Sequence, residues 1–187
     1  MPQAPSAPGW KEKPKGGPFA IGVLVVGIAA ALLPSEGGRI LRPYLDSARI
    51  PTACMGVIGK EVTRRYQAGL LFTDAECESM EKAYLNKMVA TMQSCVPQSV
   101  QQQMTYGEWI SYGHWAYNTG TQSFCNSTLG RRLGAGDRVG ACRAMGAWTY
   151  ITLHGRKRNC RDPDMQRICS GIVTRRDLEV SSCLQAI

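Results

Sequence analysis

The chain has 187 residues, a length that fits one compact domain with attached segments. Its composition, with 44% hydrophobic and 19% charged residues, excludes a wholly disordered, collagen-like or coiled-coil chain. Lysine and arginine number 22 against 14 aspartates and glutamates, which gives a net charge of +8. This excess indicates a polyanionic partner, but charge alone does not choose between nucleic acid, anionic lipid and an acidic cell-wall polymer.

The N-terminal residues divide into a basic tail and an apolar run. Residues 1–18 are rich in proline and glycine and carry three lysines, so we expect a disordered basic tail. Residues 19–33 contain no charge, and a positive flank before an apolar run is what the secretion machinery recognises. As a helix, this run would extend about 22 Å, less than the roughly 30 Å of a hydrocarbon core. We therefore expect a weak, uncleaved membrane segment with a cytoplasmic N-terminus; a cleaved signal peptide and a buried core helix are the alternatives.

The eight cysteines lie between positions 54 and 183, and no two of them form a CxxC pair. This spacing disfavours a zinc site and a thioredoxin-like redox site, and we expect neither a metal nor a cofactor. An even number of cysteines after an export signal indicates disulfides in an oxidising compartment. Spacing alone does not choose among the many connectivities that eight cysteines allow.

Residues 35–187 are expected to form one α+β domain, with a small β-containing lobe followed by a larger helical lobe. Glycine, proline and short apolar alternations over residues 35–72 predict turns with a small β-hairpin. Thr73 and Glu76 have the spacing of a capping box, which predicts the start of a long amphipathic helix. Further helices are expected over residues 100–117, over 128–134, after Asp137 and after Thr174, with a loop over 154–170.

Two carboxylates and a hydroxyl, those of Glu36, Asp46 and Thr52, lie within a short stretch that follows the apolar run. If a helix ends at Glu36 and a hairpin carries Asp46 and Thr52, the three side chains can face one another across a cleft. A carboxyl group in an apolar setting keeps its proton and serves as a general acid, while a second carboxylate and a hydroxyl hold an attacking water. This grouping fits the cleavage of a glycosidic bond.

Three blocks of sequence extend this pattern along the chain. They are EGGRILRPYLDSARIPTACMG (36–56), then YNTG (117–120), FCNSTL (124–129) and RLGAGD (132–137), and finally AC (141–142), WTY (148–150), GIVTRR (171–176) and CL (183–184). Together they resemble the phage-type lysozymes of glycoside hydrolase family 24, the endolysins of tailed phages. The resemblance extends from Glu36 to Leu184, and it implies a lysozyme-like fold preceded by an N-terminal hydrophobic segment.

The resemblance implies an activity and a role for each candidate residue. The protein would hydrolyse the β-1,4 bond between N-acetylmuramic acid and N-acetylglucosamine in peptidoglycan, and so lyse the bacterial host at phage release. Glu36 would be the general acid. Asp46 and Thr52 would stabilise the developing charge and position the water, with inversion at the anomeric carbon. Asn118 lies in a block that lines the family's cleft, and we expect it to bind substrate.

Two departures from the family pattern lie near the candidate catalytic residues. Tyr44 stands eight positions after Glu36, one more than is usual in the family. We expect the extra residue either to displace Glu36 or to be absorbed at Gly37 and Gly38. Where the family has a histidine shortly after the threonine, residues 54–59 read CMGVIG. We interpret the family's histidine as a packing partner, so its absence leaves the proposed chemistry in place.

The resemblance also implies how the cysteines pair and where the protein acts. The implied disulfides are Cys54–Cys77, Cys95–Cys125, Cys142–Cys183 and Cys160–Cys169. The glycine- and alanine-rich segment 19–33 resembles that of signal-anchor-release endolysins, which accumulate inactive on the inner membrane. We expect the protein to be held in the host inner membrane through this segment, and then to act in the periplasm as a monomer on peptidoglycan. No nucleic-acid-binding motif is present, so nucleic acid is not an expected partner.

Two other functions stay open at this point. A lytic transglycosylase would use an acid without the water site of Asp46 and Thr52, and it would leave a 1,6-anhydro product. A non-catalytic, membrane-tethered peptidoglycan-binding module would need neither Glu36 nor Asp46. Hydrolysis is preferred because all three residue types are present in the family's order.

Overall fold

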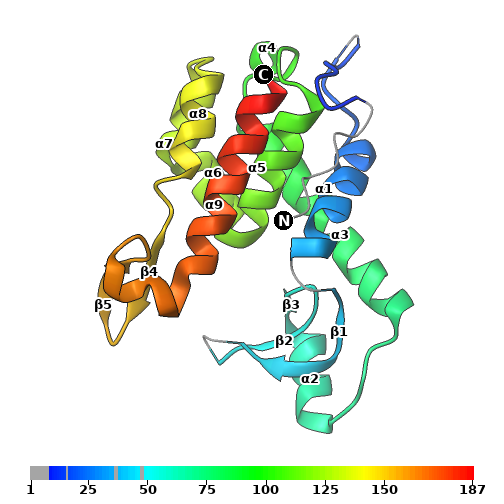
Figure 1. The fold of residues 1–187 in the computed structure, drawn as a ribbon. Coiled ribbons are helices and arrows are strands. Elements are labelled where there is room, and N and C mark those ends of the chain that lie inside the picture. The colour runs from blue at the N-terminus through cyan, green and yellow to red at the C-terminus, as the bar shows by residue number, and fades with distance from the viewer. Residues whose placement is uncertain (1–8, 16, 36–37, 47–48) are drawn as a thin grey trace. The chain divides into compact units, whose positions relative to one another are not determined.

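The fold was taken from a computed structural model, which describes residues 9–15, 17–35, 38–46 and 49–187. Its elements are α1 (Ile21–Ser35), β1 (Ile40–Leu45), β2 (Pro51–Cys54), β3 (Val57–Ile58), α2 (Lys60–Ala68), α3 (Asp74–Ser94), α4 (Gln98–Gln101), α5 (Tyr106–Thr119), α6 (Thr121–Asn126), α7 (Thr128–Gly134), α8 (Arg138–Met145), β4 (Tyr150–Leu153), β5 (Arg156–Asn159), the 3₁₀ helix η1 (Pro163–Met165) and α9 (Gln166–Ala186) (Figure 1). The chain forms two compact units. The smaller unit comprises Ile21–Val89, and the larger unit comprises the described residues up to Ala20 together with residues 90–187.

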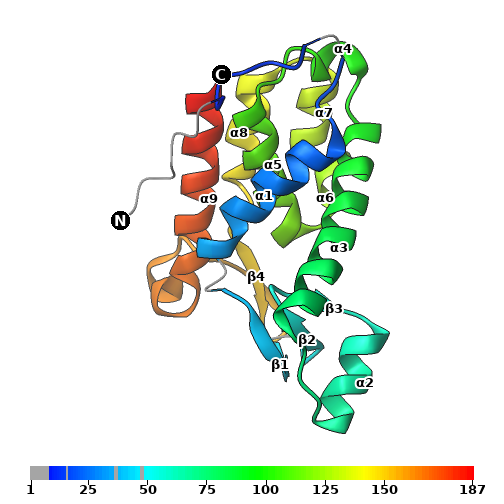
Figure 2. The same ribbon diagram turned by 90° about the vertical axis from the view of Figure 1, so that its right-hand side faces the viewer.

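The smaller unit contains an antiparallel sheet in the order β1-β2-β3, with α2 packed against it (Figure 2). Buried apolar side chains from β2, α2 and the start of α3 form its core, together with Phe72; they are Ala53, Cys54, Val62 and Cys77. A backbone hydrogen bond of 2.9 Å from the Phe72 N–H to the Leu41 carbonyl ties the segment before α3 to β1. The small β-hairpin expected from the sequence is present, and a third short strand extends it.

Arg65, near the end of α2, links this helix to the start of α3. Its guanidinium donates to the two oxygens of Glu76 at 2.6 and 3.0 Å. Arg65, together with Thr73, lowers the pKa of Glu76 from an ordinary 4.5 to about 2. Because folding lowers this pKa, the ionised carboxylate stabilises the fold above pH 4.5, and this contribution is lost as the pH falls towards 2.

The apolar run of the sequence forms most of α1. Leu24, Ile28 and Leu32 are fully buried and recur every four residues, so they lie on one face of the helix. Val23 and Val26 lie on the exposed side. Within the part of the chain that the structure describes, no helix combines the length and the apolar character needed to cross a membrane.

In the larger unit, α5 packs against α6, α8 and α9 (Figures 1 and 2). Three of its aromatic side chains are fully buried, namely Trp109, Tyr112 and Trp115. His114 of α5 also reaches α9, where its Nδ1 lies 2.7 Å from Glu179 Oε1. The helical lobe expected from the sequence is therefore organised around the α5–α9 pair.

Four disulfides cross-link the two units internally. One lies in the smaller unit, Cys54–Cys77, and three lie in the larger unit, Cys95–Cys125, Cys142–Cys183 and Cys160–Cys169. Cys54–Cys77 joins β2 to α3, and Cys142–Cys183 joins α8 to α9. These are the four pairs that the family resemblance implies.

Local capping signals predicted two helix starts correctly. At α3, the Glu76 N–H donates to the Thr73 hydroxyl at 3.3 Å, and the Thr73 N–H donates to the Glu76 carboxylate at 2.8 Å. At α8, the Gly140 N–H donates to Asp137 Oδ1 at 2.8 Å. The short helix predicted over residues 128–134 is also confirmed as α7.

Three expectations for the larger unit were wrong. The helix expected from residue 100 is interrupted, because α4 ends at Gln101 and α5 begins at Tyr106 with a new capping box. The loop expected over residues 154–170 contains β5, which pairs with β4 through a turn in which His154 and Gly155 have φ values of 49° and 75°. Thr174 does not cap a helix, because it lies inside α9 and its hydroxyl donates to the Ser170 carbonyl.

Part of the expected disordered tail packs on the start of α5, within the larger unit. The carbonyl groups of Trp10 and Glu12 accept hydrogen bonds from the N–H groups of Gly107 and Tyr106. This differs from the disorder expected for residues 1–18. The Trp10 ring packs on Gly107, and this contact holds the two carbonyl groups next to the donors at the start of α5. Residues 1–8 and 16 lie outside the described residues.

Candidate functional site

Asp46 and Thr52 lie on either side of the turn that joins β1 to β2. Asp46 directly follows β1, and Thr52 lies in β2, where it pairs with Tyr44 across the sheet. The Thr52 hydroxyl lies 3.5 Å from Asp46 Oδ2 and donates to the Ile50 carbonyl at 3.0 Å. Thr52 is buried and Asp46 is half-buried. The structure thus brings together two of the three side chains predicted to be catalytic.

The main chain of the turn fixes the Asp46 carboxylate. Asp46 Oδ1 accepts the N–H of Ile50 at 2.9 Å, and the Asp46 N–H donates to the Ile50 carbonyl at 3.1 Å. The N–H of Arg49, a residue with a φ of 62°, donates to the Asp46 carbonyl at 2.9 Å. Because Oδ1 is engaged by the backbone, the orientation of Oδ2 towards Thr52 follows from the turn itself.

Glu36, the predicted general acid, lies outside the described residues, as does Gly37. On the N-terminal side of Glu36, helix α1 ends at Ser35. The chain after it resumes at Gly38, whose φ of 91° lies in the left-handed region that favours glycine. The catalytic role of Glu36 therefore stays a prediction.

A bulge in β1 lies between Gly38 and the turn that follows Asp46. Ile40 pairs with Cys54 and Tyr44 with Thr52, so four steps along β1 correspond to two along β2. A bulge adds residues to one strand and leaves the pairing on either side intact. The extra residue that the sequence shows before Tyr44 can therefore be absorbed within β1, a location that the sequence analysis did not consider.

An ion pair between Arg39, the residue before β1, and the buried carboxylate of Glu81 on α3 was missed from the sequence. Arg39 donates to Glu81 Oε2 at 2.9 Å, and Glu81 Oε1 accepts the N–H of Met55 at 3.2 Å. Glu81 is buried, so this carboxylate is held by both contacts out of bulk water. An acidic residue four positions after Cys77, on the apolar face of a predicted helix, is the signal that could have identified it.

Asn118, the expected substrate contact, lies near the end of α5 in the larger unit. Its Oδ1 accepts from Arg175 of α9 at 2.5 Å, and its amide donates to the His114 carbonyl at 3.1 Å. The side chain is exposed and held in one orientation by both contacts. Contact of Asn118 with substrate stays a prediction.

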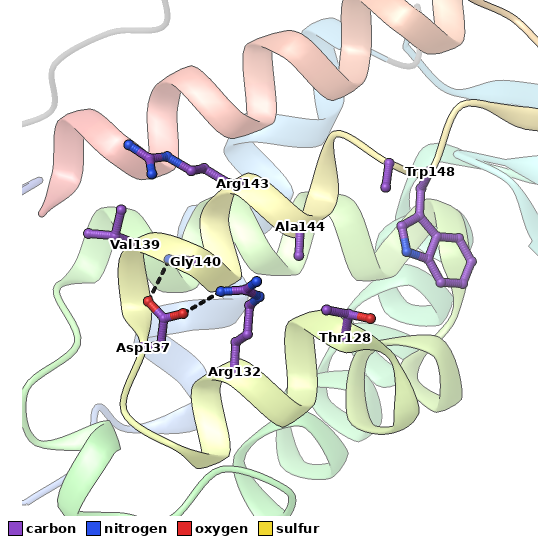
Figure 3. Close-up of a pocket in the computed structure, with 9 residues that line it drawn as sticks. Thr128, Arg132, Asp137, Val139, Gly140, Arg143, Ala144 and Trp148 are labelled. Carbon is purple, nitrogen blue, oxygen red and sulfur yellow. Dashed lines mark hydrogen bonds and ion pairs between the residues drawn. The ribbon is translucent and has the colours of Figure 1, made fainter.

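A pocket of about 500 Å³ in the larger unit is lined by residues of α7 and α8 and by Trp148 (Figure 3). Among its lining residues, Asp137 is the only carboxylate, and Arg132 and Arg143 supply two cations. The Gly140 N–H and the Arg132 guanidinium, 2.8 and 2.5 Å from the Asp137 oxygens, lower the pKa of this carboxyl group. A lowered pKa disfavours Asp137 as a general acid, so this pocket does not replace the candidate site around Asp46 and Thr52.

The family model described as phage lysozyme matches residues 35–179, which include Asp46, Thr52 and the position of Glu36. The chain belongs to the phage lysozyme family. It is accordingly a lysozyme-type endolysin and a hydrolase, and membership of this family implies peptidoglycan as the substrate.

Relatives of this phage lysozyme carry the name SAR-endolysin. One from Enterobacteria phage PA-2 is 32% identical over 174 residues, which cover 88% of this chain and 91% of the relative. One from Bacteriophage PS119 is 31% identical over 168 residues, which cover 85% of this chain and 86% of the relative. These names agree with the signal-anchor-release type that the N-terminal segment resembles.

Solved structures show the same fold. The endolysin from Escherichia coli O157:H7 phage FAHEc1 has a TM-score of 0.64 and 24% identity, with coverage of 94% of this chain and 98% of that chain. A mutant of P22 lysozyme has a TM-score of 0.61 and 24% identity, with coverage of 85% and 95%. The fold of this phage lysozyme is therefore the lysozyme-like α+β fold, with a small sheet and a mostly helical body.

Proposed function

We propose that the protein hydrolyses the β-1,4 bond between N-acetylmuramic acid and N-acetylglucosamine in peptidoglycan, and lyses the bacterial host when phage are released. The observation that carries this proposal is the approach of Thr52 Oγ1 to Asp46 Oδ2, 3.5 Å apart, in the region matched by the phage lysozyme family. A carboxylate and a hydroxyl this close together can both contact one water molecule that lies beside them. A module that only binds the wall has no need of such a pair.

In this mechanism, Glu36 donates its proton to the glycosidic oxygen as that oxygen leaves the anomeric carbon. Asp46 accepts a proton from the attacking water and stabilises the positive charge that develops on the sugar. The Thr52 hydroxyl already donates to the Ile50 carbonyl, so its lone pairs are left to accept from the same water. Attack on the face opposite the leaving group inverts the anomeric carbon and leaves Glu36 ionised and Asp46 protonated. Proton exchange with solvent then restores the starting state.

Digestion of purified peptidoglycan by the full-length, released protein tests this reaction. We expect fragments that end in reducing N-acetylmuramic acid, with the new hydroxyl first in the α configuration because the β bond is inverted. Proton NMR of the early products and mass spectrometry of the final products provide the measurement. Fragments with 1,6-anhydro ends would identify a lytic transglycosylase instead, and bound protein with uncut glycan would identify a binding module.

We also propose that residues 19–33 hold the protein in the host inner membrane, with the N-terminus in the cytoplasm, until it is released into the periplasm. The lysines before the uncharged run and the names of the relatives support this proposal. Glycine and alanine contribute little transfer energy, so the segment would be held only weakly in lipid. In the periplasm we propose that the protein acts as a monomer, with peptidoglycan rather than nucleic acid as its anionic partner.

Replacing Gly22 and Ala30 together by leucine should keep the protein in the membrane. Both residues are exposed in the folded structure, and no atom lies within 4 Å of a Cβ atom placed at Gly22. Each added methylene strengthens burial in lipid by about 0.8 kcal/mol, while the released fold has room for the new side chain at Gly22. We expect the variant in the membrane fraction and lysis of the culture to be delayed or lost.

The matched control replaces the same two residues, Gly22 and Ala30, by serine, which introduces a polar hydroxyl in place of the apolar leucine side chain. Fractionation of expressing cells and culture turbidity are measured in parallel for both variants and the wild type. The serine variant should be released at least as readily as the wild type. If the leucine variant is released and lyses cells like the wild type, residues 19–33 do not control release.

A further inference from the structure

The first turn of α5 has N–H groups that the helix itself cannot satisfy, as at the start of any helix. The Glu108 N–H donates to the Thr105 hydroxyl at 3.2 Å, and the Thr105 N–H donates to the Glu108 carboxylate at 2.7 Å. These two bonds form a capping box. The N–H groups of Tyr106 and Gly107 lie between the two members of the box and take no part in it.

Two carbonyl groups of the N-terminal tail satisfy these donors. The Tyr106 N–H donates to the Glu12 carbonyl at 2.8 Å, and the Gly107 N–H donates to the Trp10 carbonyl at 2.9 Å. The indole ring of Trp10 also lies directly on Gly107, where an added Cβ atom would stand 2.5 Å from Trp10 Cε2. Only glycine leaves room for the ring, so Trp10 and Gly107 are complementary in shape.

Phe19, which follows the tail, makes a second contact near the start of α5. Its ring packs edge-on against the ring of Tyr106, with 5.8 Å between centroids. Its carbonyl accepts from the side-chain amide of Gln93 at 2.8 Å. Because Phe19 is the first residue of the apolar run, this contact also requires that the start of the run is outside the membrane.

We propose that the start of α5 is a binding site for the chain's own N-terminal tail, and that the site fills only when the tail has crossed the membrane. This rests on the proposed anchor: while residues 19–33 span the bilayer, Trp10 and Glu12 lie on the opposite side from Gly107. Release brings the tail and the site to the same side. Because these contacts exist only in the released state, they favour it and oppose return to the membrane.

Amide hydrogen exchange in the full-length, released protein tests whether the tail occupies the site. Trp10→Ala should raise the exchange rates of the Tyr106 and Gly107 amides by at least about tenfold, because their acceptors are no longer held in place. Lys13→Ala is the matched control, since Lys13 is an exposed residue of the same tail. Both rates should stay at wild-type values in this control. Unchanged exchange in Trp10→Ala would overturn the proposal.

Gly107→Ala gives a second test, because the sign of its effect depends on the tail. Alanine is the better helix former, so an empty site predicts a higher thermal midpoint. If the Trp10 indole packs on residue 107, the new Cβ atom must displace the ring, which predicts a lower thermal midpoint. In the Trp10→Ala background the same change should raise the midpoint. A rise in both backgrounds would show that the ring does not rest on Gly107.

Cell fractionation then separates the tail site from the proposed anchor. Trp10→Ala should move protein from the soluble to the membrane fraction by about the factor seen in amide exchange, and Lys13→Ala should not. Faster exchange with an unchanged distribution would overturn the link between tail binding and release, while the anchor would stand. Wild-type protein that never enters the membrane fraction would contradict the anchor, and with it the release step of this proposal.

Discussion

Replacement of Glu36 by glutamine is expected to lower the rate of peptidoglycan cleavage by about 10²- to 10⁴-fold, the range typical of a general acid. Glutamine is close to glutamate in size, but its amide has no acidic proton to give to the leaving oxygen. Asp46 and Thr52 are unchanged in this variant, so the wall should still bind while the bond stays intact. The measurement is the loss of turbidity of purified cell walls, with binding followed by sedimentation of the protein with the walls.

Glu78→Gln is the matched control for this variant, because Glu78 is an exposed glutamate on α3. It should cleave at the wild-type rate, and both variants should have wild-type thermal midpoints. Asp46→Asn should lose more activity than Thr52→Ala. Asparagine cannot take up the proton of the water, whereas without the Thr52 hydroxyl the water is still present but is less well oriented. Cleavage by Glu36→Gln at the wild-type rate would show that another group donates the proton.

Helix starts could be predicted where the signal lies within four residues. The box at Thr73 and Glu76 and the cap at Asp137 depend only on a side chain and the N–H groups of the next turn. The same signature is present at Thr105 and Glu108, but the apolar pattern over residues 100–117 was interpreted as one continuous helix. A local cap therefore gives a helix boundary more reliably than the extent of an apolar pattern does.

The pairing of β4 with β5 could not be predicted, because only β4 alternates between exposed and partly buried residues, whereas β5 lacks this pattern. β5 reads Arg-Lys-Arg-Asn and lies in a hairpin that the Cys160–Cys169 disulfide adjoins. Its turn places His154 at a φ of 49°, in the left-handed region that is uncommon for residues other than glycine. Strands of this kind are defined by their partner and by a nearby cross-link rather than by their own composition.

The candidate site was predicted only in part. The residue types could be read from Glu36, Asp46 and Thr52 in chain order, and the family resemblance implies their roles. The approach of Asp46 to Thr52 follows from the strand register and the turn at Ile50, which sequence spacing does not specify. For the buried carboxylate of Glu81, the sequence shows a charged residue on the apolar face of a helix, but it does not indicate that Arg39 is its partner.

Removal of the buried Glu108 carboxylate is expected to have the largest effect on stability. Glu108 is 0% exposed, and it accepts from Arg138 Nε at 2.8 Å and Nη2 at 2.5 Å, and from the Thr105 N–H at 2.7 Å. Glu108→Ala leaves the Arg138 side chain, itself only 15% exposed, without its partner. Breaking a buried pair in this way costs about 3–5 kcal/mol of unfolding free energy. Urea unfolding of the oxidised protein, followed by circular dichroism, measures this loss.

Glu61→Ala is the matched control for this prediction. Glu61 also binds two guanidinium groups, those of Arg64 and Arg65, but its side chain is 45% exposed, so water replaces the lost contacts. We expect a far smaller loss than for Glu108→Ala. Equal losses in the two variants would show that burial is not what makes the Glu108 pair important.

A double variant separates the free-energy cost of leaving one buried charge unpaired from the stability that the Glu108–Arg138 pair contributes. Glu108→Ala with Arg138→Ala should cost less than the sum of the two single changes, because no buried charge is left alone. The capping bond to the Thr105 N–H is lost in both the single and the double variant. Exchange of the Tyr106 and Gly107 amides should therefore rise in both, since only one of the two bonds of the capping box, from the N–H of residue 108 to the Thr105 hydroxyl, is left to hold the turn that presents these donors to the tail.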